Sequence, residues 1–201
     1  VDGGQVFAVP NTAQRYTIPQ TYDGIDVPDA TPPPEETDPT PSPDPDPPTG
    51  DDAEDTRNKI VKFMTDRIGK YGYSQGPGRL KPDQSGVTDC SALTRFAYLS
   101  VTGKDIGTYT DAQVTSKQTR LIQKGGGGNS PTESLMKKGD LVISARYGTA
   151  SNRIASHVEI YMGGGRIIGH GGVPYMGPVT KDLAARTADK KTWWIKRLNS
   201  L

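Results

Sequence analysis

The sequence is poor in the groups that most enzymes use for chemistry. Its 201 residues include one cysteine and two histidines. A single cysteine excludes an internal disulfide and any metal site that needs several thiolates. The chain also lacks a run of about 18 apolar residues, so we expect no segment that spans a membrane.

The net charge of +1 hides an acidic N-terminal part and a basic remainder. Residues 1–50 carry one basic and nine acidic residues, whereas residues 51–201 carry 23 basic and 14 acidic residues. A basic globular part suits an anionic partner such as nucleic acid, anionic lipid or an acidic wall polymer, and it equally suits general solubility. Neither tryptophan lies in a basic aromatic platform, so we expect no nucleic-acid partner.

Composition divides the chain into three parts. Residues 1–27 are too few for a core and are expected to be the end of an upstream domain. Residues 28–50 are rich in Pro, Asp, Glu and Thr and contain no large apolar side chain, which predicts a flexible linker. Residues 51–201 are numerous enough for an independent core and are expected to form one compact domain. The chain begins at Val1 without a leader, which indicates a fragment or a processed product.

The compact domain shows helical patterns first and strand patterns afterwards. We predict helices over residues 52–68, 89–101 and 110–122, and strands over residues 139–143, 157–162, 166–170 and 192–198. This order favours an α+β domain with helices packed on one side of an antiparallel sheet. The glycines at 125–128 predict a flexible break, because no Gly-Lys-Ser/Thr follows them as in a phosphate loop.

The lone cysteine, Cys90, lies at the predicted start of the second helix. Asp89 or Thr88 before it is a good N-cap, and Leu93 and Phe96 after it recur at helical spacing. Unpaired N–H groups and the positive end of the helix dipole favour a thiolate there. A buried, inert core residue is the alternative for an isolated cysteine.

The two histidines lie at equal sequence distance on either side of the dipeptide Gly163-Gly164. Two glycines form a favoured two-residue hairpin turn because both tolerate positive φ. If the chain turns there, His157 and His170 face each other across two strands, on one side of the sheet. A bulge or a longer turn through Gly165 would shift this register.

These groups suit attack of a thiolate on an acyl carbon. Cys90 is then the nucleophile, His157 the base that takes its proton and returns it to the leaving amine, and His170 the group that orients His157. The backbone N–H of Cys90 is placed to stabilise the oxyanion. This chemistry needs no cofactor, and we predict no metal, although Glu159 on the same face as His157 leaves a weak metal site as an alternative.

The order of these motifs resembles the NlpC/P60 peptidases, which are papain-like bacterial and phage enzymes that hydrolyse peptide bonds in peptidoglycan. The resemblance rests on Asp-Cys-Ser at 89–91, Gly-Asp-Leu-Val at 139–142, Ser-His-Val-Glu-Ile-Tyr at 156–161 and Ile-Ile-Gly-His at 167–170. It covers about residues 55–198. It implies a papain-like NlpC/P60 fold in which residues 51–201 are the catalytic domain.

The resemblance also implies the roles of several residues. Cys90, His157 and His170 match the catalytic positions of the family. The residues expected to contact substrate are Asp89, Ser91, Glu159 and either Tyr71 or Tyr73, since the family has a tyrosine near the mouth of the site. Two departures stand out: Ala92 replaces a usual glycine, and Glu159 replaces a usually small residue.

The implied function is a cysteine endopeptidase that cuts the peptidoglycan stem peptide next to D-glutamate. Two alternatives stay open: an N-acetylmuramoyl-L-alanine amidase of CHAP type, and a non-catalytic basic module that binds anionic wall polymers. The expected partner is bacterial peptidoglycan, at an extracellular or virion-associated location. The acidic Pro-rich spacer also resembles the modular design of phage lysins and tail-associated wall hydrolases.

Overall fold

The computed structural model describes residues 50–147, 152–172 and 174–201. The predicted N-terminal segment 1–27 and the predicted linker, except Gly50, lie outside the described residues. The described elements are, in chain order, α1 (Gly50–Thr65), β1 (Gly72–Tyr73), η1 (Pro77–Leu80), α2 (Pro82–Ser85), β2 (Val87–Thr88), α3 (Cys90–Thr102), α4 (Thr110–Thr115), β3 (Thr119–Gly125), η2 (Glu133–Leu135), β4 (Leu141–Arg146), β5 (His157–Gly163), β6 (Arg166–His170), β7 (Pro178–Asp182), α5 (Leu183–Thr187) and β8 (Lys190–Leu198).

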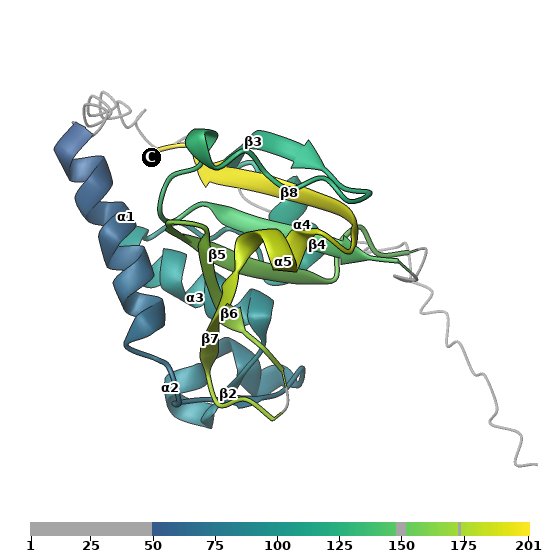
Figure 1. Ribbon diagram of the computed structural model, residues 1–201. Coiled ribbons are helices and arrows are strands. Elements are labelled where there is room, and N and C mark those ends of the chain that lie inside the picture. The colour runs from purple at the N-terminus through teal and green to yellow at the C-terminus, as the bar shows by residue number, and fades with distance from the viewer. Residues whose placement is uncertain (1–49, 148–151, 173) are drawn as a thin grey trace, which may run out of the picture. The chain divides into compact units, whose positions relative to one another are not determined.

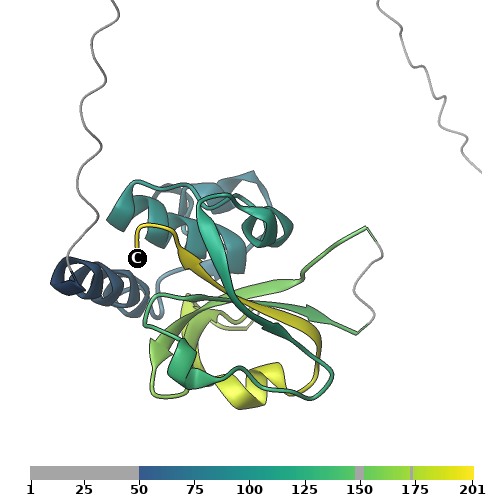
Figure 2. The ribbon, with the colours of Figure 1, turned by 90° about the horizontal axis from the view of Figure 1, so that it is seen from above.

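A six-stranded antiparallel sheet forms the centre of the fold, with the strand order β3-β8-β4-β5-β6-β7. Helices α1 and α3 lie on one side of the sheet and the short α5 lies on the other (Figures 1 and 2). A separate parallel pair, β1 and β2, lies just before α3 in the chain. The predicted α+β class is therefore confirmed.

Each face of the sheet has its own apolar core. On the side of α1 and α3 the buried residues include Ile60, Leu93, Val158, Ile160 and Ile168. The opposite core includes residues from β4 to β8 and the first residue of α5: Val142, Tyr161, Ile167, Leu183 and Ile195. Because neighbouring residues of a strand point to opposite faces, β5 and β6 contribute to both cores.

Helix α3 begins and ends where the sequence predicts. The carboxylate of Asp89 accepts a hydrogen bond from the N–H of Ala92 at 2.8 Å, so Asp89 rather than Thr88 is the N-cap. The helix ends at Gly103, whose φ of +69° is the left-handed conformation of a glycine C-cap. Leu93 and Ala97 pack into the first core, which fixes α3 against β5 and β6.

The predicted third helix is too long. Helix α4 ends at Thr115, and residues 119–125 form β3, which pairs with β8. The helical assignment of this segment was wrong because pairing with the C-terminal strand, a contact distant in sequence, outweighs local helix propensity. The sequence also gave no sign of β7, which completes one edge of the sheet.

The predicted pairing of the two histidines is also wrong. The turn lies at Gly164 and Gly165, with Gly163 paired to Arg166, and a bulge follows between Gly163 and Tyr161. Beyond the bulge Tyr161 pairs with Ile167 and Ile160 with Ile168. Continuing this register places Val158, not His157, opposite His170, so the two histidines do not form the predicted cross-strand pair.

None of the helices in the described part of the chain is both long and apolar enough to cross a bilayer.

Candidate active site

Cys90 is the first residue of α3, and its thiol is free and buried. It is only 6% exposed. As the first helical residue, Cys90 has a backbone N–H without an intrahelical partner. The side chain therefore lies beside a donor that the helix itself does not pair, at the positive end of a 13-residue helix.

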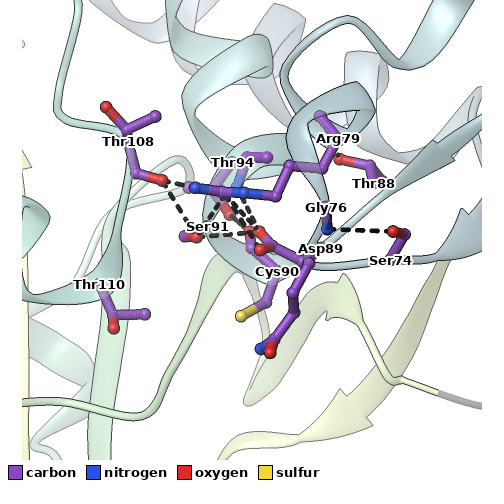
Figure 3. A network of polar contacts seen from close by, with 12 residues as sticks. Ser74, Gly76, Arg79, Thr88, Asp89, Cys90, Ser91, Thr94, Thr108 and Thr110 are labelled. Atoms are coloured by element: carbon purple, nitrogen blue, oxygen red, sulfur yellow. Dashed lines mark hydrogen bonds and ion pairs between the residues drawn. The ribbon is translucent and has the colours of Figure 1, made fainter. Parts of the chain in front are cut away.

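A buried polar network fixes the start of this helix. Arg79 is 2% exposed, and its Nη1 donates to Asp89 Oδ1 at 3.1 Å and to the carbonyl of Thr108 at 3.1 Å. The hydroxyl of Ser91 donates to the same Asp89 oxygen at 2.9 Å. Figure 3 shows the guanidinium of Arg79 between Thr108 and the Asp89–Ser91 pair, with the sulfur of Cys90 pointing away from this network. The predicted substrate-contacting residues Asp89 and Ser91 thus hold the helix start.

His157, the first residue of β5, interacts with the side chains of both Cys90 and Glu159. Burial lowers the pKa of His157, but hydrogen bonding and charge from Cys90 and Glu159 outweigh burial, and the pKa is raised overall. The structure therefore brings together the predicted nucleophile and the predicted base. It does so in an environment that favours the imidazolium form of His157.

Glu159 lies behind His157, with its side chain 1% exposed. Its Oε1 is 3.3 Å from Nε2 of His157, and its Oε2 accepts a hydrogen bond from Nε of Arg186 at 2.8 Å. Burial opposes the charged carboxylate, but hydrogen bonding and charge from His157 and Arg186 outweigh burial and lower the pKa of Glu159 to about 2. Glu159 was expected to contact substrate; it lines neither of the two cavities described below.

His170 is buried and is engaged with backbone groups. Its Nε2 donates to the carbonyl of Tyr71 at 3.1 Å, and its Nδ1 accepts from the N–H of Gly172 at 3.3 Å. Burial, the largest cause, lowers its pKa and favours the neutral ring. Within the described residues no hydrogen bond joins His170 to His157, although both residues line one cavity, so the expected third group is not hydrogen-bonded to the base.

The structure distinguishes the two candidate tyrosines. The ring of Tyr73 contacts His170 edge-on, with centroids 5.2 Å apart, and lines a cavity together with His157. Burial, followed by the charge of Cys90, raises the pKa of Tyr73. Tyr71 is buried and its hydroxyl is bonded to Asp83 and Arg67. Of the two tyrosines, Tyr73 is therefore the one that lies beside both histidines in this cavity.

Two cavities flank the Cys90–His157 pair. One, of about 220 Å³, is lined by His157 and three cationic side chains, Arg146, Lys181 and Arg186. The other, of about 180 Å³, is lined by Cys90, Arg79, Tyr109 and Arg153, among others. Ser156 borders both cavities. An extended substrate placed over Cys90 would have room on both sides.

Sequence reasoning missed the arginines that hold the site, Arg79 and Arg186. Arg79 lies in a loop rich in turn residues, and Arg186 lies in a five-residue helix that has no clear periodicity. Their partners are 10 and 27 residues away in sequence. No local pattern identifies such pairs, so only the fold reveals them.

Among the described residues no group of three or more His, Cys, Asp or Glu side chains is arranged to hold a metal ion. Glu159, the acid that could have completed a weak metal site with His157, is instead paired with Arg186.

Comparison with known proteins gives a consistent result. The model of the family described as NlpC/P60 family matches residues 70–197. Protein P54 of Enterococcus faecium is 38% identical over 86 residues, which are 43% of this chain and 13% of Protein P54. The chain thus spans a small part of the length of that curated relative.

Two solved structures from Trichomonas vaginalis have a similar fold. NlpC1 aligns with a TM-score of 0.51 and 20% identity, over 75% of this chain and 46% of that chain. NlpC2 aligns with a TM-score of 0.50 and 18% identity, over 71% of this chain and 46% of that chain. At these identities the similarity concerns the fold, and it confirms the predicted architecture.

Proposed function

We propose that this chain, which belongs to the NlpC/P60 family, is a cysteine endopeptidase. Members of the family are peptidoglycan hydrolases. The proposed reaction is cleavage of an amide bond in the stem peptide of bacterial peptidoglycan, next to D-glutamate. The observation that carries this proposal is the placement of Cys90 at the start of α3 beside His157 at the start of β5. The bond next to D-glutamate follows from the resemblance alone.

The reaction proceeds by nucleophilic catalysis. The thiolate of Cys90 attacks the carbonyl carbon of the scissile amide, and the carbonyl oxygen becomes an oxyanion stabilised by the unpaired backbone N–H of Cys90. Imidazolium at His157 gives its proton to the leaving amine as the C–N bond breaks, which produces a thioester. A water molecule then gives a proton to His157 and attacks the thioester, and collapse of the tetrahedral intermediate releases the acid product and restores the thiolate of Cys90 beside the imidazolium of His157.

The two cavities suit the two sides of the scissile bond. His157 protonates the leaving amine, so the cavity lined by His157 takes the amine side and the cavity lined by Cys90 takes the acyl side. On the acyl side, Nη2 of Arg79 is buried without a hydrogen-bond partner among the described residues. A substrate carbonyl or carboxylate oxygen would satisfy it.

Replacement of Cys90 by Ala tests the proposal. The variant is expected to release no new amino groups from purified cell walls and to unfold at a temperature close to that of the wild type. Because Cys90 is the only cysteine, alkylation of the wild-type protein with iodoacetamide is a matched control that must also stop the release. Undiminished release by both proteins would refute the proposal.

The products distinguish the endopeptidase from the amidase, because the Cys90–His157 chemistry serves both. Mass spectrometry of fragments from defined muropeptides is expected to show L-Ala still linked to the lactyl group. Loss of that link would instead identify an amidase. A non-catalytic wall-binding module would bind walls in a salt-sensitive way, retain binding when Cys90 is replaced, and form no product.

The site of action is the bacterial wall, outside the cytoplasm, for either a secreted enzyme or a component of a phage particle. The excess of basic residues in 51–201 favours association with anionic wall polymers.

A further inference from the structure

We propose that Glu159, held by Arg186, is the positioning residue of His157, in place of His170. This inference rests on the proposed function, because it assigns the third member of the same site. The orienting group is then Glu159 of β5, the strand that carries His157, and not His170 of the neighbouring strand β6.

The contact between Glu159 and His157 is the first support. Oε1 of Glu159 and Nε2 of His157 are 3.3 Å apart and both are buried. Neither atom has a well-aligned hydrogen-bond partner among the described residues, so the contact is an ion pair in which each atom is available to the other. With Nε2 facing the carboxylate, Nδ1 is the nitrogen left for the thiol of Cys90.

The second support is that other groups fix the carboxylate. Arg186 donates to Oε2 at 2.8 Å, and Nζ of Lys181 lies 3.8 Å from Oε1. Arg186 therefore satisfies the oxygen that does not face His157. A carboxylate that is 1% exposed and anchored by arginine has little freedom to turn away from the imidazole.

Gly169 on the adjacent strand gives the Glu159 side chain its space. By the observed register Gly169 lies opposite Glu159. A Cβ atom at Gly169 would lie 2.6 Å from Cγ of Glu159, so any side chain there would displace the carboxylate. The strand position from which a β6 side chain would reach the base is therefore empty, and Glu159 fills it.

His170, one residue further, has no ring nitrogen free for His157. Tyr71 accepts from Nε2 and Gly172 donates to Nδ1, which fixes the neutral tautomer. Together with the edge-on contact to Tyr73, these bonds assign His170 to holding the mouth of the site in shape.

A carboxylate in this position stabilises imidazolium, the form that must give its proton to the leaving amine. It also holds the ring so that the other nitrogen faces the thiol. Loss of the charge should therefore lower the pKa of His157 and remove activity from the alkaline side of the pH profile.

Because the chain has two histidines, an NMR titration of the isotope-labelled imidazoles tests this directly, without any wall substrate. In Glu159→Gln the midpoint of His157 is expected to fall by about one pH unit or more, while that of His170 stays in place. Asp140→Asn is the matched control: Asp140 is equally buried and is paired with Arg197 at 2.7 Å, so its loss costs stability without contacting His157. An unchanged His157 midpoint in a folded Glu159→Gln protein would overturn the proposal.

Kinetics on cell walls supply the second readout. Glu159→Gln is expected to lower kcat about tenfold or more with little change in KM, and to shift the alkaline limb of kcat/KM to lower pH. His170→Gln is expected to leave the NMR midpoint of His157 unchanged; a midpoint that falls as far as in Glu159→Gln would overturn the assignment. If the wild type cleaves no wall but the His157 midpoint still depends on Glu159, the proposed function fails and the positioning contact stands.

Discussion

A buried carboxylate paired with an arginine backs each of the two reacting groups, and the two ion pairs differ in what their oxygens bind. Asp89, beside Cys90, binds the N–H of Ala92, the hydroxyl of Ser91 and the guanidinium of Arg79. Glu159, beside His157, binds Arg186 through one oxygen and faces the imidazole with the other.

This difference separates two uses of the same chemistry. The carboxylate oxygens of Asp89 accept hydrogen bonds from the backbone and from neighbouring side chains. Asp89 therefore determines where α3 begins and where the thiol of Cys90 lies. One oxygen of Glu159 is aimed at the base, so its charge acts on a proton that moves. The carboxylate of Asp89, which is bonded to structural groups, determines the position of the thiol. The carboxylate of Glu159, which has one oxygen facing the imidazole, affects the pKa of His157.

The largest expected effect comes from breaking the pair that shapes the site. Asp89→Ala removes the N-cap of α3 and leaves the guanidinium of Arg79, 2% exposed, without its counter-charge. Loss of one partner of a buried pair costs about 3–5 kcal/mol, and we expect a fall of this size in the free energy of unfolding, measured by urea titration.

The double variant Arg79→Met, Asp89→Ala tests the cause of that fall. It removes the stranded charge and should recover a large part of the loss, because an apolar replacement of both partners is often close to neutral. A double variant as unstable as Asp89→Ala would mean that the cap, and not the ion pair, carries the effect.

The contribution of Glu159 to the free energy of unfolding should depend on pH. The pKa of Glu159 is about 2 in the folded protein, against 4.5 as its ordinary value. A lowered pKa stabilises the fold above the unfolded pKa, and this stabilisation is lost as the pH falls from 4.5 towards 2. We expect the stability advantage of the wild type over Glu159→Gln to shrink by about 3 kcal/mol over that range.

Urea unfolding at several acidic pH values measures this advantage. A constant difference between the two proteins from neutral to acidic pH would contradict a charged Glu159 in the folded state.

The smallest expected effect comes from an ion pair at the surface. Arg95 and Asp105 are joined by two hydrogen bonds, at 2.8 and 2.5 Å, but the Asp105 side chain is 49% exposed. Asp105→Ala should therefore cost about 1 kcal/mol or less, by the same urea titration. A fall in the free energy of unfolding as large as that of Asp89→Ala would contradict the expectation that the buried ion pairs of the site contribute more than an exposed ion pair.

The sequence predicted the parts of the site that local patterns determine. An N-cap at Asp89 or Thr88, Cys90 in the first turn of a helix, and the strands that carry His157 and His170 follow from capping chemistry and period-two alternation. The pairing of Cys90 with His157 followed from their scarcity and from a family resemblance.

Long-range geometry could not be predicted in the same way. Gly163, Gly164 and Gly165 all have positive φ, and three permissive residues do not determine where the chain turns. The bulge that follows adds one residue to one strand, and that residue decides which residues of β5 and β6 lie opposite each other. Arg186 is joined to Glu159 only by tertiary packing.

The glycine hairpin between β5 and β6 also indicates how such a site could evolve or be redesigned. A change of one residue in the length of this turn could shift β6 relative to β5 by one position and place His170 directly opposite His157. The partner of the base would then be exchanged by an insertion or a deletion, without any substitution in either strand. The length of the turn between β5 and β6 can therefore change which residue contacts the base, just as a substitution can.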